Sequence, residues 1–417
     1  MFRFVTELKG LIIDIDSFEK NYQEWEPLFE RYHCCCLTED KLLSTELKRQ
    51  LGVNKVLYIE KWEKFLAPNK KTHNEALQLM ELLTTEVAYV SKDLNILKNA
   101  LGFMSGTILI EEVPTKYKYA GICPDLVVNS VEMLAKRLEQ NRIGFCGENC
   151  ISPENTSLSG MMLPMLSNQD DEIVKIFSLG RYFGYDHYMS QLHPYSSAIY
   201  LNKQEGRTYY GVFDAQFSDL YFRAALKIKE RLDVDCICNV PVRPGKTDRF
   251  RQIVSELSIR TELEDISEKF ICTKDYTSQK RFNSQERVEN VKGVFLYTGQ
   301  LCGKRVLLID DIISTGATVL ECVRTLKVAG ASEVVVLTLA VNQLGLTYWS
   351  SSQPIVECPY CGEKMRLLVN GTTGSFFYKC NGCPKTINYM VGKKQLIEKV
   401  NAEFVGKLED EDMEFLS

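Results

Sequence analysis

Two adjacent carboxylates stand just before a loop of small and hydroxyl-bearing residues. Asp310 and Asp311 follow the aliphatic run 306–309. The loop that comes next comprises Ser314, Thr315, Gly316, Ala317 and Thr318. Because such a loop has little side-chain bulk, its backbone N–H groups and hydroxyls can close around a phosphate at the N-terminus of a helix. The two carboxylates can accept hydrogen bonds from the vicinal hydroxyls of a ribose. The segment therefore predicts a site for a sugar phosphate.

The elements that must position these residues alternate between strands and helices from about residue 225 onward. Strands are expected at 236–242, 306–309 and 334–340, and helices at 249–259 and 317–328. This alternation is typical of a parallel sheet with helical crossovers, and ligands of such sheets bind at the carboxyl ends of the strands. An ordinary turn with an aspartate N-cap would account for the Asp-Asp pair alone, but not for the whole segment.

Two further blocks carry basic residues. The first follows the Val-Pro-Val end of a strand and contains Arg243, Lys246 and Arg249. The second, at 286–295, contains Arg287. Cationic side chains after a strand can bind a diphosphate, and a basic residue on a mobile loop can close over it, although single basic residues on loops are usually solvated.

These three blocks, in this order, resemble the type I phosphoribosyltransferases and in particular their ComF-like branch. The resemblance implies that Asp310 and Asp311 bind the ribose hydroxyls of phosphoribosyl diphosphate (PRPP) and that loop 314–318 binds its 5-phosphate. It implies transfer of a phosphoribosyl group to a nitrogenous base or related acceptor, with release of diphosphate. It also implies Mg²⁺, which keeps most of its waters and needs few protein ligands.

The acceptor pocket of such enzymes is a variable hood, which we expect within 176–235, at 178–182, Tyr209 and Tyr210. The residues there do not identify a particular base. A second hypothesis is a PRPP-sensing regulator or nucleic-acid-binding factor that makes no product. The two differ in whether bound PRPP is turned over.

Four cysteines near the C-terminus have the spacing of a zinc site. They form two C-x₂-C pairs separated by 18 residues: Cys358, Cys361, Cys380 and Cys383. The residues between the pairs predict a hairpin around Asn370-Gly371, and hence a zinc ribbon. We favour a structural Zn²⁺, because four thiolates leave no open coordination position for catalysis. The ribbon also resembles those appended to topoisomerases, so nucleic-acid contact through its basic residues is the alternative. ComF-like proteins usually carry a zinc finger before the transferase domain, whereas this ribbon follows it.

The N-terminal segment places two carboxylates at the end of an apolar strand. Asp14 and Asp16 have the spacing of haloacid-dehalogenase-like (HAD) phosphatases, in which the first carboxylate attacks phosphorus and the second acts as acid and base. Residues 67–71 and 87–93 resemble the later HAD motifs in order. Lys92 departs from that pattern, since it occupies the place of an acidic residue that would hold Mg²⁺. We therefore expect a HAD-like fold, with phosphatase activity as a third hypothesis.

Composition limits the remaining classes of function. The 417 residues carry a formal net charge of -5, which offers no global attraction to nucleic acid or anionic lipid. The apolar runs are too short for a membrane helix, so we expect no membrane contact and a cytoplasmic location. The predicted fold class is α/β. The expected units are a HAD-like domain at 1–115, a linker or lid at 116–175, the transferase sheet at 176–348, the zinc ribbon at 354–392 and a tail at 393–417.

Overall fold

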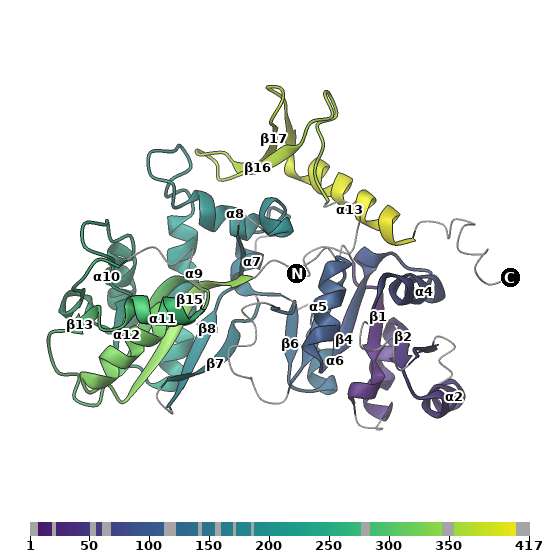
Figure 1. The fold of residues 1–417 in the computed structure, drawn as a ribbon, viewed down its shortest axis with the longest axis horizontal. Coiled ribbons are helices and arrows are strands. Elements are labelled where there is room, and N and C mark those ends of the chain that lie inside the picture. Colours follow the sequence, from purple (N-terminus) through teal and green to yellow (C-terminus); the bar gives the residue numbers. More distant parts are fainter. Residues whose placement is uncertain are drawn as a thin grey trace.

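Two sheets of mostly parallel strands make up most of this computed structural model, with a small antiparallel sheet near the C-terminus (Figure 1). The structure describes residues 7–18, 22–50, 56–60, 68–111, 122–140, 144–154, 160–169, 172–184, 187–276, 284–343 and 354–405. The predicted α/β class is confirmed. No helix among these residues is both long and apolar enough to cross a membrane.

The first sheet has six parallel strands in the order β3-β2-β1-β4-β5-β6. Its central strand β1 is buried on both faces, because Leu11 and Ile13 pack into one core cluster and Ile12 into the other. Burial on both faces is why this strand is a continuous apolar run in the sequence. The elements of this unit are β1 (Gly10–Asp14), α1 (Glu26–Arg31), β2 (His33–Thr38), α2 (Lys41–Gln50), β3 (Val56–Tyr58), α4 (Lys70–Met80), β4 (Val87–Ser91), α5 (Leu94–Gly102), β5 (Gly106–Ile110), β6 (Leu126–Val128) and α6 (Val131–Glu139).

The segment 116–175, for which we expected a linker or lid, instead supplies strands to both sheets in its described parts. Strand β6 pairs with β5 in the first sheet, and α6 follows it. Strands β7 (Leu163–Gln169) and β8 (Glu172–Ser178) form an antiparallel pair at the edge of the second sheet. We did not predict these strands because the segment is rich in polar residues. Such residues are compatible with an edge strand, which exposes one face to water.

The second sheet holds the predicted sugar-phosphate segment in its middle. Its order is β11-β10-β14-β15-β8-β7, with β9 (Arg181–Phe183) also pairing with β15. Strand β14 (Arg305–Ile313) runs parallel to β10 (Cys236–Asn239) and β15 (Glu333–Gln343). Its first half is fully buried, whereas Asp310 and Asp311 emerge toward its carboxyl end. The remaining elements are α7 (Cys146–Cys150), α8 (Pro194–Leu201), α9 (Asp214–Leu232), α10 (Phe250–Thr261), β11 (Glu264–Asp265), β12 (Phe270–Cys272), α11 (Ser284–Val291), β13 (Phe295–Tyr297) and α12 (Ala317–Val328).

The cysteine-rich segment forms the predicted hairpin and adds a third strand. Strands β16 (Met365–Val369), β17 (Phe376–Cys380) and β18 (Thr386–Asn388) are antiparallel neighbours. The segment after them, predicted as a tail, begins as the helix α13 (Tyr389–Val405), which runs from the ribbon to α4 of the first unit (Figure 1). Phe404 packs against Phe103 there, with 5.5 Å between the ring centroids. The helix therefore ties the C-terminal ribbon to the N-terminal unit.

Candidate functional site

The carboxylates of Asp310 and Asp311 lie where β14 reaches the open edge of the second sheet. Each carboxylate accepts a hydrogen bond from the backbone N–H of the next residue, at 2.8 Å for Asp310 and 2.6 Å for Asp311. The Tyr221 hydroxyl, from α9, donates to the carbonyl of Asp310 at 2.7 Å. These bonds fix the strand end and leave oxygens of both side chains on the wall of a cleft.

Two cations offset the charge of this pair. Lys203 forms an ion pair with Asp311, and Arg249 lies 3.4 Å from the same carboxylate. Burial opposes ionisation of Asp311, but Lys203 and Arg249 outweigh it, so the pKa of Asp311 falls below its ordinary value. Burial and the neighbouring Asp311 carboxylate raise the pKa of Asp310. One member of the pair is thus held ionised while the other retains its proton to higher pH.

The hydroxyl-rich loop leads directly into α12. Gly316 adopts φ 81°, the left-handed region that glycine reaches without strain, and it stands at the N-cap of the helix. The first N–H groups of a helix have no partners within it, so α12 presents donors at this loop. From α11, Arg287 Nη1 donates to Ser314 Oγ at 2.9 Å. A basic side chain therefore lies against the loop, although Arg287 stands on a helix and not on the mobile loop that the sequence led us to expect.

The basic block after β10 lines the same cleft as the carboxylates. The cleft has a volume of about 720 Å³, and it brings together Arg243, Lys246, Arg249, Asp310, Asp311 and Thr318 from two separate stretches of sequence, 243–249 and 310–318. Arg243 is held by the carbonyl of Tyr276, at 2.9 Å, and its guanidinium stacks over that residue's ring. Arg287 is absent from the walls of this cleft and reaches the site only through Ser314.

A smaller pocket of about 320 Å³ adjoins the cleft and shares Lys203, Arg249 and Asp311 with it. Aromatic side chains from the segment 209–221 line it, including Tyr210 and Tyr221. Of the two tyrosines expected in the hood, Tyr210 lines this pocket. Tyr209 faces a different cavity, on the other side of α8.

Among residues 178–182, also assigned to the hood, Arg181 serves another purpose. Arg181 is fully buried, and its guanidinium donates to Glu148 at 2.7 Å through both Nε and Nη2. A third bond of 2.7 Å reaches Asp125, next to β6 of the first sheet. Arg181 therefore joins the two sheet units and cannot contact an acceptor.

Lys203 is the site residue that sequence reasoning missed. It lies just past α8, in a stretch without a motif, and no spacing relates it to Asp311. Only the packing of α8 beside the sheet brings the two together. A buried or half-buried pair of carboxylates requires nearby cations. The sequence therefore indicated that some cation must lie beside Asp310 and Asp311, but not which one.

The four predicted zinc ligands converge. Their sulfur atoms all lie within 4.8 Å of one another, and the shortest separations are 3.4 Å between Cys361 and Cys380 and 3.6 Å between Cys361 and Cys383. A tetrahedral Zn²⁺ with bonds of about 2.3 Å places its sulfurs roughly 3.8 Å apart. The backbone N–H groups of Gly382 and Cys383 point at Cys380 Sγ, as donors to a thiolate would. The cluster therefore fits a structural Zn²⁺.

Replacing Cys380 with serine should abolish zinc binding and unfold the ribbon. The free energy of binding a structural zinc contributes directly to the free energy of folding. The three short strands should therefore lose their order without the metal. Zinc content by mass spectrometry should fall from about one per chain to near zero. The exposed Cys302 provides the control, and Cys302→Ser should retain the metal. Equal zinc loss in both variants would contradict the assignment.

The N-terminal carboxylates are occupied by neighbouring donors. Asp14 is 3% exposed, and its Oδ2 accepts hydrogen bonds from Ser17 Oγ and, at 2.7 Å, from Ser91 Oγ. Asp16 accepts from Thr38 Oγ1 at 2.6 Å. The cavity between the two carboxylates measures about 10 Å³, which is about the size of one water.

Lys70, from the segment that resembles a later HAD motif, and Lys92, which departs from the HAD pattern, both make contacts away from the carboxylate pair. Lys70 pairs with Glu403 at 2.8 Å, on the face of α4 that receives α13. Lys92 lies 5.5 Å from the ring centroid of Phe18. The structure thus places the two carboxylates close together but does not bring Lys70 to them.

Comparison with known families matches residues 248–350 to the phosphoribosyl transferase domain. The matched segment contains the carboxylate pair, the hydroxyl-rich loop and Arg287, so this chain carries a type I phosphoribosyltransferase domain of the α/β class. No curated protein matches the chain. A solved structure, "Crystal Structure analysis of a Dehalogenase with intermediate complex", matches 28% of this chain at 20% identity with a TM-score of 0.23. The chain spans about half of that protein, 54% of its length, and a TM-score this low does not establish a shared fold.

Proposed function

We propose that this protein transfers a phosphoribosyl group from PRPP to a nitrogenous acceptor and releases diphosphate. The observation that supports it most is the single cleft into which two of the sequence blocks bring three cations, two carboxylates and the start of α12. This donor set matches the parts of PRPP in order: a phosphate at the helix N-terminus, hydroxyls at the carboxylates and a diphosphate at the cations. The order of the blocks further supports membership of the ComF-like branch.

In the proposed reaction, the bond between C1 of the ribose and the diphosphate oxygen breaks, and a bond from C1 to the acceptor nitrogen forms. Diphosphate leaves with the bonding electron pair, and the acceptor loses a proton. Arg243 and Lys246 stabilise the negative charge that develops on the diphosphate. Asp310 and Asp311 orient the ribose, and their oxygens suit Mg²⁺, which would neutralise the leaving group when bound with PRPP.

We infer that the acceptor occupies the adjoining pocket of about 320 Å³. Tyr210 and Phe217 give it an aromatic wall, and Asp214 supplies a polar group that already accepts from Asn202 at 2.7 Å. A flat nitrogen heterocycle fits this combination of ring faces and one polar side, because ring faces attract each other in offset stacks. The pocket opens onto Asp311, beside which C1 of the ribose would lie.

An assay of diphosphate release tests the proposal. Protein, PRPP and Mg²⁺ are mixed with a panel of purine, pyrimidine and other nitrogenous acceptors, and diphosphate is measured over time. We expect release with at least one acceptor and none without PRPP. PRPP binding without release by any acceptor would favour the regulator hypothesis, and absence of PRPP binding would refute both.

The proposed catalytic pair predicts a pH dependence. Because the pKa of Asp310 is raised above its ordinary 3.8, the carboxylate becomes ionised only at higher pH than an exposed aspartate. Activity should therefore rise with pH as Asp310 loses its proton, since an ionised carboxylate is the better acceptor for ribose hydroxyls. The measurement is kcat/KM for PRPP against pH, and Asp310→Asn should flatten its acidic limb. If the fall in kcat/KM at low pH is the same in that variant, the group that titrates is not Asp310.

We further propose that the N-terminal unit serves as a scaffold without phosphatase turnover. Its carboxylates already accept hydrogen bonds from serine and threonine hydroxyls, and the cavity beside them admits no phosphate ester. Its links to the rest of the chain, through Arg181 and α13, support a structural role.

A further inference from the structure

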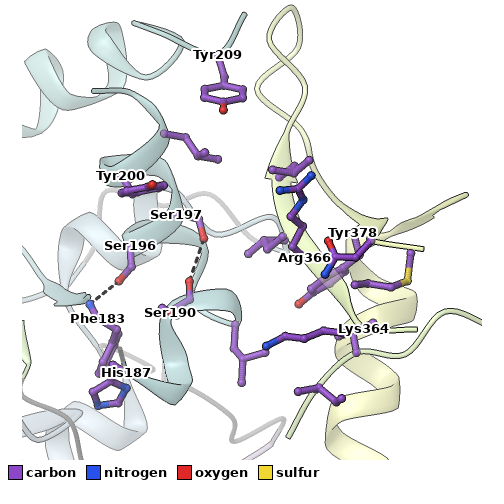
Figure 2. Close-up of a pocket in the computed structure, with 18 of the residues that line it drawn as sticks. Phe183, His187, Ser190, Ser196, Ser197, Tyr200, Tyr209, Lys364, Arg366 and Tyr378 are labelled. Carbon is purple, nitrogen blue, oxygen red and sulfur yellow. Dashed lines mark hydrogen bonds between the residues drawn. The ribbon is translucent and has the colours of Figure 1, made fainter. Parts of the chain in front are cut away.

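A second cleft, of about 680 Å³, lies between the hood side of the transferase unit and the zinc ribbon (Figure 2). One wall comes from β9 and α8, with the residues that follow each, and the other from residues 354–356 and the hairpin of β16 and β17. Its volume is in the range of about 300–1,000 Å³ that small-molecule sites occupy. Neither the carboxylate pair nor loop 314–318 lines it.

The ribbon is packed against the hood firmly enough to make this cleft a defined cavity. Phe376 of β17 stacks on Phe213, with 5.8 Å between the ring centroids. At the tip of the hairpin, a Cβ on Gly371 would lie 2.2 Å from the carbonyl oxygen of Thr208, so only glycine allows this approach. These contacts hold the ribbon against the hood and so set the distance between the walls of the cleft.

The charges in the cleft are all of one sign. Arg207 from the hood side, and Lys364 and Arg366 from the ribbon, line it, and no aspartate or glutamate is among its described lining residues. Within the described ranges, none of these three cations pairs with a carboxylate. Figure 2 shows Lys364 extending from the ribbon into the space between the walls, and Arg366 on the hairpin beside it. In a chain of net charge -5, such a group of unneutralised cations favours an anionic ligand.

Aromatic rings and hydroxyls complete the lining. Tyr200 and Tyr209 stand on the hood wall (Figure 2), and Tyr200 is 50% exposed, so its ring face is accessible. Ser197 on the same wall offers a hydroxyl. Tyr378 lies on the ribbon wall, and its buried hydroxyl has no hydrogen-bond partner in the described part of the chain. Exposed aromatic faces beside cations suit a flat base that carries a phosphate.

We propose that this cleft binds a nucleotide, with its base against the tyrosines of the hood and its phosphate between Lys364 and Arg366. The ligand is either a free nucleotide or one nucleotide of a single-stranded nucleic acid. Both present the same base and phosphate to the cleft. The proposal does not depend on the transferase activity. The two clefts are nevertheless close, because Leu201 and Gln204 line this one while Lys203, between them, pairs with Asp311 in the other.

The test is a binding titration of the zinc-loaded full chain in the presence of saturating PRPP and Mg²⁺, which occupy the transferase cleft. Calorimetry follows AMP and UMP, with adenosine and inorganic phosphate as partial ligands, and fluorescence anisotropy follows a labelled, 5′-phosphorylated oligothymidylate. We expect AMP and UMP to bind at least about tenfold more tightly than adenosine or phosphate, because each partial ligand lacks one set of contacts. If the oligonucleotide binds much more tightly than AMP and UMP, the natural ligand is a single strand. If their affinities are equal, the natural ligand is a free nucleotide.

Three variants locate the binding. Lys364→Ala with Arg366→Ala should weaken nucleotide binding about 10- to 100-fold, and Tyr200→Ala roughly 5- to 100-fold without a change of charge. Lys385→Ala removes a cation of the same ribbon that lies 5.1 Å from the Tyr360 ring centroid, outside the cleft, and should have no effect beyond about twofold. Failure of all nucleotides to bind, or equal losses in the Lys385 variant, would overturn the proposal. If PRPP itself does not bind, the transferase proposal fails while these comparisons still stand.

Discussion

Replacing both Asp310 and Asp311 with asparagine is expected to reduce phosphoribosyl transfer about 10²- to 10³-fold, even when PRPP is saturating. This is the loss typical of removing a preorganised electrostatic contact from a transition state. The variant keeps the shape of the strand end but loses both negative charges beside the ribose. The rate of diphosphate release at saturating acceptor measures the effect.

The matched control for this variant is Asp233→Asn. Asp233 ends α9 with φ 47°, a conformation that asparagine also tolerates, and it lies far from the cleft beside Arg305. Its activity should equal that of the unmodified protein within about twofold. If the two variants lose activity equally, or if the double variant keeps full activity, Asp310 and Asp311 do not act as proposed.

Removing Arg181 should destabilise the protein by about 3–5 kcal/mol, because the substitution leaves buried carboxylates without their partner. Arg181→Met keeps an unbranched apolar stem but leaves Glu148 and Asp125, both buried, without their guanidinium. The change in free energy of unfolding is measured by urea denaturation. Arg223→Ala, which breaks an exposed pair with Asp219, is the control and should cost less than about 1 kcal/mol. Equal shifts in the two variants would show that the buried network contributes little.

The same network predicts how stability changes with pH. Burial opposes ionisation of Glu148, but Arg181 and His193 outweigh it and hold its pKa well below the ordinary 4.5. A depressed pKa in the folded state contributes stability above pH 4.5, and that contribution is lost as the pH falls toward the folded pKa. The unmodified protein should therefore lose stability on acidification below this pH more steeply than Arg181→Met does.

The transferase core was predictable because its signals are local and mutually consistent. A buried aliphatic strand, two carboxylates at its end and a glycine before a helix each specify the same turn in β14 and α12. The cysteine spacing was equally direct, since two C-x₂-C pairs converge on one point in any zinc hairpin.

Features that depend on distant packing could not be predicted. Lys203 meets Asp311 only because α8 packs beside the sheet, and Arg181 meets Asp125 only because two units are joined. A lone basic residue in a sequence has the same appearance whether it is solvated, catalytic or buried. Helix α13 was not predicted for a related reason. Its apolar residue Phe404 packs on Phe103 of the N-terminal unit, and this distant contact cannot be inferred from the local sequence.

The most direct test of the central claim is a crystal structure of the protein with PRPP and Mg²⁺ bound. The account predicts the 5-phosphate on the backbone of loop 314–318, the ribose hydroxyls at Asp310 and Asp311, and the diphosphate beside Arg243 and Lys246. PRPP bound outside the cleft, or reversed so that its diphosphate lies at the N-terminus of α12, would contradict it.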